Sequence, residues 1–147
     1  MKRQPSIPEL DPLNVFIGRW ITEGVTVPKA GEPAAPIVAS DVYEWAPGGH
    51  FVMHPAYGRI GSMEVGGLEI IGHDASTKQF HTHFFDSQGN VTSETLSHRD
   101  GVWTWQGTLA RCTGTFSNDS KTLTAHHERL DAGRWVPSME VTLRKIA

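Results

Sequence analysis

The sequence has one cysteine, no long apolar run and no basic cluster, and each of these absences excludes a class of protein. Cys112 stands alone and cannot form an intramolecular disulfide, which favours a reducing compartment. No stretch approaches the ~20 apolar residues of a membrane-spanning helix. Pro5 and Pro8 interrupt the N-terminus where a signal peptide would carry its apolar segment. We therefore expect a cytoplasmic protein that has no membrane partner.

The charges indicate no nucleic-acid partner either. The formal net charge is −3, and acidic and basic residues are interspersed along the chain. Binding to a duplex needs a concentrated basic face that displaces counterions from the phosphates. With 147 residues, of which 38% are hydrophobic, the chain is long enough for a single domain, residues 1–147, with its own core.

Short turn-forming segments divide the chain at near-regular intervals. They lie at residues 28–36, 47–49, 58–61, 74–77, 87–90, 100–101, 106–107, 118–120 and 131–133. Between them the sequence alternates as β-strands do, so we expect about ten short strands joined by hairpins. A meander of that many strands loses its two exposed edges if it closes into a barrel. The sequence therefore predicts an all-β fold, a ten-stranded antiparallel up-and-down β-barrel.

The expected elements can be placed to within a few residues. The strands are expected at residues 17–27, 37–46, 50–57, 63–73, 78–86, 91–98, 102–106, 109–116, 122–130 and 135–146. A short N-terminal helix is expected within residues 7–16, because Leu10, Leu13 and Ile17 recur at helical spacing. It would cover one mouth of the barrel. The loop at residues 28–36 is rich in proline and glycine and lies where a lid could sit, although an ordinary surface loop is the more common meaning of such a segment.

The polar and apolar alternation is blurred in several strands. In residues 78–86, one face carries His81, His83 and Phe85, and the other also carries aromatic side chains. A barrel that encloses a ligand cavity has a mixed interior of this kind. The same blur arises when the outer face packs against a second copy of the chain, so a homodimer is left open.

Aromatic and histidine side chains are the candidates for contact with a ligand. They are Tyr43, Trp45, His54, His81, His83, Trp103, Trp105 and His127. Trp103 and Trp105 share one strand face, which we expect to point inward. If His54, His81 or His83 lines an apolar cavity, burial should lower its pKa.

No metal site and no catalytic residue is assigned from the sequence. The two histidines of His81-Thr82-His83 could meet one metal ion with a third ligand such as His54 or His127, but a hydrogen-bonding pair on a barrel wall is the more common meaning of this motif. Cys112 is interpreted as a small buried side chain. No nucleophile elbow or phosphate-binding glycine loop is present.

The sequence thus predicts a protein that binds a small, mostly apolar molecule inside the barrel. One or two histidines would anchor a polar group of that ligand. The alternative is a small enzyme of the isomerase or cyclase type, with a cavity histidine as acid or base. Asp41, Glu44, Glu69 or Glu128 could orient such a histidine.

Several segments resemble known barrel families. Gly18-Arg19-Trp20 resembles the start of lipocalins and their calycin relatives, in which the tryptophan packs at the closed end, often beneath an arginine of the last strand. That resemblance assigns Trp20 a structural role and gives Arg144 the arginine's place. Residues 43–51, 68–74 and 83–89 resemble the DUF1579 family of lipocalin-like barrels, which implies the fold and leaves the function undefined.

Nitrobindin-type haem barrels resemble the chain more distantly, in size, strand count and the Gly-x-Trp opening. They hold the haem iron through a histidine on a strand near the C-terminus. The last expected strand, residues 135–146, contains no histidine, and His126 and His127 lie one strand earlier. Haem is therefore not expected, and the identity of any cofactor is left open.

Overall fold

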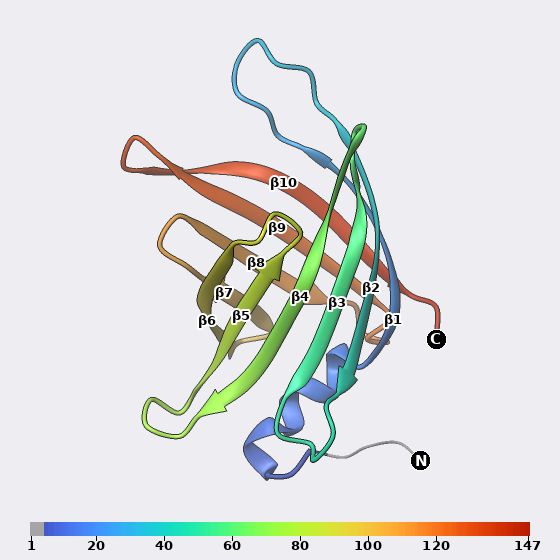
Figure 1. Ribbon diagram of the computed structural model, residues 1–147, viewed down its shortest axis with the longest axis vertical. Helices are drawn as coiled ribbons and strands as arrows, with labels where there is room; N and C mark the ends of the chain where they lie inside the picture. Colours follow the sequence, from blue (N-terminus) through green and yellow to red (C-terminus); the bar gives the residue numbers. More distant parts are fainter. Residues whose placement is uncertain (1–4) are drawn as a thin grey trace.

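The computed structural model describes residues 5–147 and shows a closed barrel of ten antiparallel strands (Figure 1). The strands are β1 (Gly18–Thr26), β2 (Pro36–Trp45), β3 (Val52–Ile60), β4 (Met63–Asp74), β5 (Gln79–Asp86), β6 (Val91–Arg99), β7 (Val102–Gln106), β8 (Ala110–Phe116), β9 (Thr122–Asp131) and β10 (Arg134–Lys145). Each strand pairs with its sequence neighbours, and β1 closes the barrel by pairing with β10. The prediction of a ten-stranded up-and-down barrel is confirmed.

The glycine pairs in the sequence have two different structural roles. Gly48 and Gly49 both have positive φ and form the turn between β2 and β3, as expected. Gly66 and Gly67 lie within β4, and the pairing of β3 with β4 runs through them without a register shift. A Cβ atom on Gly66 would lie 2.3 Å from the carbonyl oxygen of Ala56. Glycine is therefore required there by the close approach of two strands.

In the part of the chain that the structure describes, a single helix covers one end of the barrel. The helix η1 (Pro8–Phe16) is a 3-10 helix and buries Leu10, Leu13 and Phe16. A 3-10 helix has three residues per turn, so these three side chains lie on one side. The prediction named Ile17 instead of Phe16 as the third residue, because it was based on the longer repeat of an α-helix.

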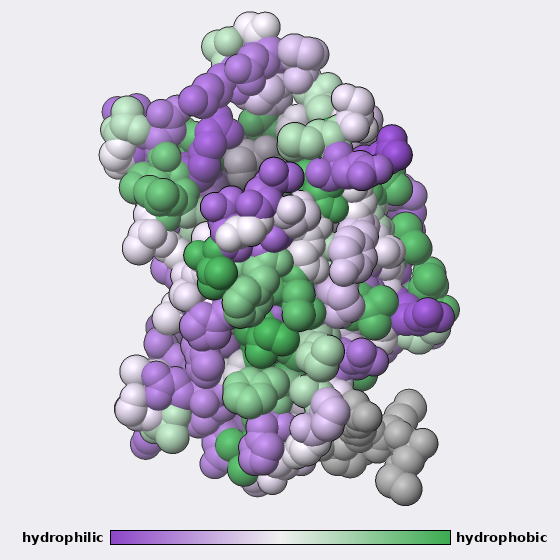
Figure 2. Space-filling view, in the orientation of Figure 1, coloured by the Kyte–Doolittle hydropathy of each residue, from purple (hydrophilic) through white to green (hydrophobic). Residues whose placement is uncertain are grey.

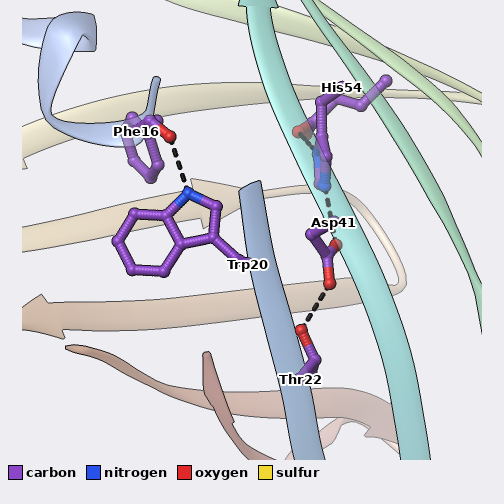
Figure 3. A network of polar contacts seen from close by, with 6 residues as sticks. Phe16, Trp20, Thr22, Asp41 and His54 are labelled. Atoms are coloured by element: carbon purple, nitrogen blue, oxygen red, sulfur yellow. Dashed lines mark hydrogen bonds and ion pairs between the residues drawn. The ribbon is translucent and has the colours of Figure 1, made fainter. Parts of the chain in front are cut away.

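An aromatic cluster fills the barrel above this helix. The ring of Phe16 lies 4.8 Å from that of Trp103 and 5.3 Å from that of Tyr43, measured between centroids. Trp20 is almost fully buried, and its Nε1 donates a hydrogen bond of 2.8 Å to the carbonyl oxygen of Phe16 (Figure 3). Trp20 thus lies at the closed end, where the resemblance to lipocalins placed it.

The prediction that Arg144 lies over Trp20 is wrong by one residue. Lys145 lies over the Trp20 ring, with Nζ 5.7 Å from the centroid, whereas Arg144 pairs with Glu23 on the outer surface. The cause is the strand register. Trp20 faces Lys145 across the β1–β10 pair, and Arg144 faces Ile21, so its side chain belongs to the opposite face.

The other end of the barrel is formed by hairpin loops. Because the strands alternate in direction, the loops that follow β1, β3, β5, β7 and β9 lie away from η1 (Figure 1). The proline-rich loop between β1 and β2 belongs to this set. Within residues 5–147, no helix is long and apolar enough to cross a membrane.

Candidate functional site

The barrel encloses a cavity of about 650 Å³ to which all ten strands contribute. Its walls also include residues 63–66 and 86–88 beside the hairpins that follow β3 and β5, so it approaches the end opposite η1. Most of the wall is apolar. The apolar lining side chains are Ile37, Ala39, Ala56, Ile60, Met63, Val65, Phe84, Trp105, Ala110, Leu123, Ala125, Met139, Val141 and Leu143.

A buried polar array crosses one wall of this cavity. His54 on β3 lies between two carboxylates, with Nδ1 2.8 Å from Oε1 of Glu69 and Nε2 2.7 Å from Oδ1 of Asp41. Thr22 on β1 donates its hydroxyl to the second oxygen of Asp41 (Figure 3). His54, Asp41 and Glu69 are each more than nine-tenths buried. The four residues come from four consecutive strands, so the barrel itself holds the array in place.

The two carboxylates make His54 a cation. Burial lowers its pKa, but the hydrogen bonds to Asp41 and Glu69 outweigh that effect and raise the pKa to about 9. Both ring nitrogens therefore carry protons at neutral pH and donate to the carboxylates. The expectation that burial would lower the pKa of a cavity histidine is wrong for His54, because it left the carboxylates out. The Tyr43 ring stacks on the imidazolium of His54, with 3.7 Å between the ring centroids.

Glu94 is a third inward carboxyl group, and it has a different environment. It lies on β6 and borders the cavity, and burial followed by the charge of Glu69 raises its pKa to about 7. Glu94 forms no hydrogen bond or ion pair within residues 5–147. Its direct neighbour across the β5–β6 pair is Thr82, whose buried hydroxyl has no hydrogen-bond partner.

Cys112 and His127 form a second polar pair on the opposite wall. The Cys112 sulfur lies 3.6 Å from Nε2 of His127, and the two residues face each other across β8 and β9. Burial and then the nearby Glu94 and Glu69 raise the pKa of the thiol well above its usual value. Burial lowers the pKa of His127. The thiol stays protonated, which agrees with its interpretation as a buried side chain.

The structure brings four of the eight candidate ligand residues to the cavity and places four elsewhere. Tyr43, His54, Trp105 and His127 line it. Trp45 and Trp103 do not line it; they are buried in the core that η1 covers. Trp45 Nε1 donates to Oδ1 of Asn14 on η1, and Trp103 contacts Phe16.

His81 and His83 lie on the opposite face of β5 from the lining residue Phe84. Their rings contact each other, with Nδ1 of His81 3.2 Å from Nε2 of His83, and His83 bonds to Ser93 on β6. Within residues 5–147, no group of three or more histidine, cysteine or acidic side chains is placed to hold a metal ion.

The acidic residues of the site were only partly identified from the sequence. Asp41 and Glu69 were among four candidates for orienting a histidine, and both do so. Glu44 is exposed, and Glu128 instead pairs with Arg111. Glu94 was missed, although it shares its strand face with the fully buried Leu96. The sequence signal for Glu94 is weak, because Leu96 is the one apolar residue on a strand face that also carries Thr92 and His98.

The chain belongs to the DUF1579 family, described as proteins of unknown function, whose sequence pattern matches residues 8–134. No curated protein matches the sequence.

Three solved structures share the fold at low sequence identity. The structure of Rv2717c from M. tuberculosis has a TM-score of 0.67 at 11% identity, and the match covers 96% of this chain and 99% of that one. A DUF3598-family protein from Nostoc punctiforme has a TM-score of 0.63 at 15% identity, covering 97% of this chain and 51% of that one. The S-type phycobiliprotein lyase CPES from Guillardia theta has a TM-score of 0.55 at 6% identity, covering 93% and 92%. These likenesses show the fold alone.

Proposed function

We propose that this member of the DUF1579 family binds a small, mostly apolar ligand inside its barrel. The observation that carries the proposal is the cavity of about 650 Å³, with an apolar wall and one buried polar array. Pockets for small molecules commonly measure roughly 300–1,000 Å³ and combine an apolar lining with a few fixed polar groups.

The small side chains on the inner face support this function. Ala39, Ala56 and Ala125 line the cavity on β2, β3 and β9, where larger side chains would fill the space. Protein interiors are otherwise packed as densely as organic crystals, so space of this size needs an explanation. A ligand that enters past the hairpins and stops above the aromatic cluster provides one.

The polar array is better suited to binding than to proton transfer. Both nitrogens of His54 donate to carboxylates, so the imidazole has no free nitrogen for a substrate. The anchoring groups are then the remaining oxygen lone pairs of Asp41 and Glu69, held in place by His54 and Thr22. This favours a binding protein over an enzyme in which His54 acts as acid or base.

The phycobiliprotein lyase among the similar structures adds bilins to the ligand classes that should be tested. The likeness is one of fold, so the choice among ligands depends on this cavity's own side chains. A cytoplasmic location stays a prediction.

A homodimer also stays a prediction, and the outer surface offers a place for it. Pro55, Leu68, Phe85 and Val91 are neighbours across β3, β4, β5 and β6 on the outer face. Phe85 and Val91 are exposed, and Figure 2 shows hydrophobic side chains gathered over β3 to β5.

Entry of a ligand can be tested with N-phenyl-1-naphthylamine, a neutral probe whose fluorescence rises in an apolar site. We expect saturable binding of one probe per chain. Ala39→Phe places a ring inside the cavity and should abolish the signal. Ser40→Phe adds the same ring one residue further on β2, where the side chain is exposed, and should leave binding unchanged. Equal binding by both variants would contradict the proposal.

A further inference from the structure

The charges around the cavity are unbalanced toward the negative. Asp41 and Glu69 share the single positive charge of His54, and Glu94 adds a third carboxyl group, which has no hydrogen-bond or ion-pair partner among the described residues 5–147. Glu64 and Asp86 border the same cavity near its hairpins, and Glu64 there pairs with Arg59. Arg111 is the one basic side chain other than histidine among the lining residues, but its Nε donates to Glu128 and its guanidinium lies over the Trp135 ring.

We propose that the ligand carries a cationic nitrogen, as a protonated alkylamine does, and that Glu94 is its counter-ion. The inference rests on the proposed binding function and names the chemical class of the ligand.

The position of Glu94 suits this role. It shares the inward face of β6 with Thr92, another lining residue, and with Leu96, which belongs to the core. Thr82, whose buried hydroxyl has no hydrogen-bond partner within residues 5–147, is the residue opposite Glu94 across the β5–β6 pair, but it does not line the cavity. An ammonium group has three N–H donors and no acceptor, so the acceptor oxygens of the Glu94 carboxylate match it.

Within residues 5–147, the groups that interact electrostatically with Glu94 or face it across the sheet carry no positive charge. Glu69 on β4 and Cys112 on β8 both interact with it electrostatically, and neither is a cation. His127 on β9 has a lowered pKa and stays neutral at pH 7. Thr82 on β5 and Gly107, next to β7, are uncharged. The cost of ionising Glu94 in this setting would be offset by a bound ammonium ion, whereas an anionic ligand would add to the repulsion.

The affinity for an amine should consequently depend on pH. With a pKa of about 7, Glu94 is roughly one-tenth ionised at pH 6 and nine-tenths ionised at pH 8. A primary alkylamine stays protonated throughout this range. Binding of the amine should therefore strengthen by about ten-fold from pH 6 to pH 8, and it should release about half a proton at pH 7, because binding and ionisation are linked.

Three probes of equal chain length test this inference: decylamine, 1-decanol and decanoate, each displacing N-phenyl-1-naphthylamine. We expect decylamine to bind at least ten-fold more tightly than decanol, and decanoate to bind least. Glu94→Gln should weaken decylamine by about ten-fold and leave decanol within two-fold. Glu44→Gln removes the same charge from the exposed face of β2 and should change neither affinity.

The outcomes separate the two proposals. If neither the fluorescent probe nor any decyl compound binds, the proposed binding function fails. If the probe and decanol bind but decylamine has no advantage, or its advantage survives in Glu94→Gln, only the inference about the cation fails. Calorimetry on the wild-type protein in buffers of different ionisation enthalpy gives an independent readout. Absence of proton release on amine binding at pH 7 would overturn the inference even if Glu94→Gln did not fold.

Discussion

The His54 array predicts that the protein loses stability at mildly alkaline pH. In the folded state the pKa of His54 is about 9, against 6.5 for an unperturbed histidine. A pKa that is raised on folding stabilises the folded state fully below pH 6.5, and this contribution is lost as the pH rises through 9. At about 1.4 kcal/mol per pH unit, the difference corresponds to about 3 kcal/mol, a large share of a typical domain's stability.

Few other titratable groups change the folding stability between pH 7.5 and 9. The pKa values of the Cys112 thiol and the Tyr43 hydroxyl are raised from 9.0 and 10.0, so the Cys112 thiol begins to lower stability near pH 9 and the Tyr43 hydroxyl does so only above it. Glu94, whose pKa is raised from 4.5 to about 7, acts mainly below pH 7. His127, with its lowered pKa, acts below pH 6.5. The interval from pH 7.5 to 9 therefore reports chiefly on His54.

Urea unfolding at a series of pH values measures the effect. We expect the free energy of unfolding to fall by about 1 kcal/mol per pH unit or slightly more between pH 7.5 and 9. A triple variant, His54→Gln with Asp41→Asn and Glu69→Gln, replaces the charged array with neutral hydrogen-bonding groups and should lose this slope. His81→Gln, on the outer side of β5, should keep it. A wild-type free energy that stays constant across this interval would refute the cationic state of His54.

Three further predictions concern individual side chains. Trp20→Ala should lower the free energy of unfolding by ~3–5 kcal/mol, and Trp20→Phe by less, because the ring fills the closed end. Chemical denaturation measures both changes. A Trp20→Ala protein that melted like wild type but lost probe binding would contradict this prediction. Cys112 should react slowly with a thiol-specific reagent in the folded protein and rapidly in urea, because its pKa is raised and the side chain is buried; equal rates would contradict that environment. Haemin should produce no sharp one-to-one change in the Soret band. A sharp change that disappears in His127→Ala would contradict this prediction and would show that haem binds one strand earlier than in nitrobindin-type barrels.

The sequence was sufficient to predict the strands because their turns carry strong local signals. Asp100 and Gly101, for example, both have positive φ in the tight turn between β6 and β7. The closed barrel followed from the number of hairpins and the need to pair the edge strands. The 3-10 form of η1 was missed, although Pro12 within it and the three-residue spacing of Leu10, Leu13 and Phe16 both favour it.

The inward face of each strand was harder to predict than its ends. Strand β5 has Phe80 and Phe84 on one face and Phe85 on the other, so hydrophobicity alone does not choose between them. His81 and His83 consequently entered the list of ligand residues although they lie on the other face from Phe84. The partners of His54 depend on strand register. Asp41 and Glu69 are 13 and 15 residues away, and only the pairing of β2, β3 and β4 brings them to the same imidazole.

Native mass spectrometry of protein purified from its own host shows whether the cavity holds a small molecule. We predict that wild-type protein carries one non-covalent adduct, which dissociates on collisional activation. The adduct should also be present in Ser40→Phe and absent from Ala39→Phe. Ligand-free wild-type protein that also fails to take up N-phenyl-1-naphthylamine, or an adduct that persists unchanged in Ala39→Phe, would contradict the claim.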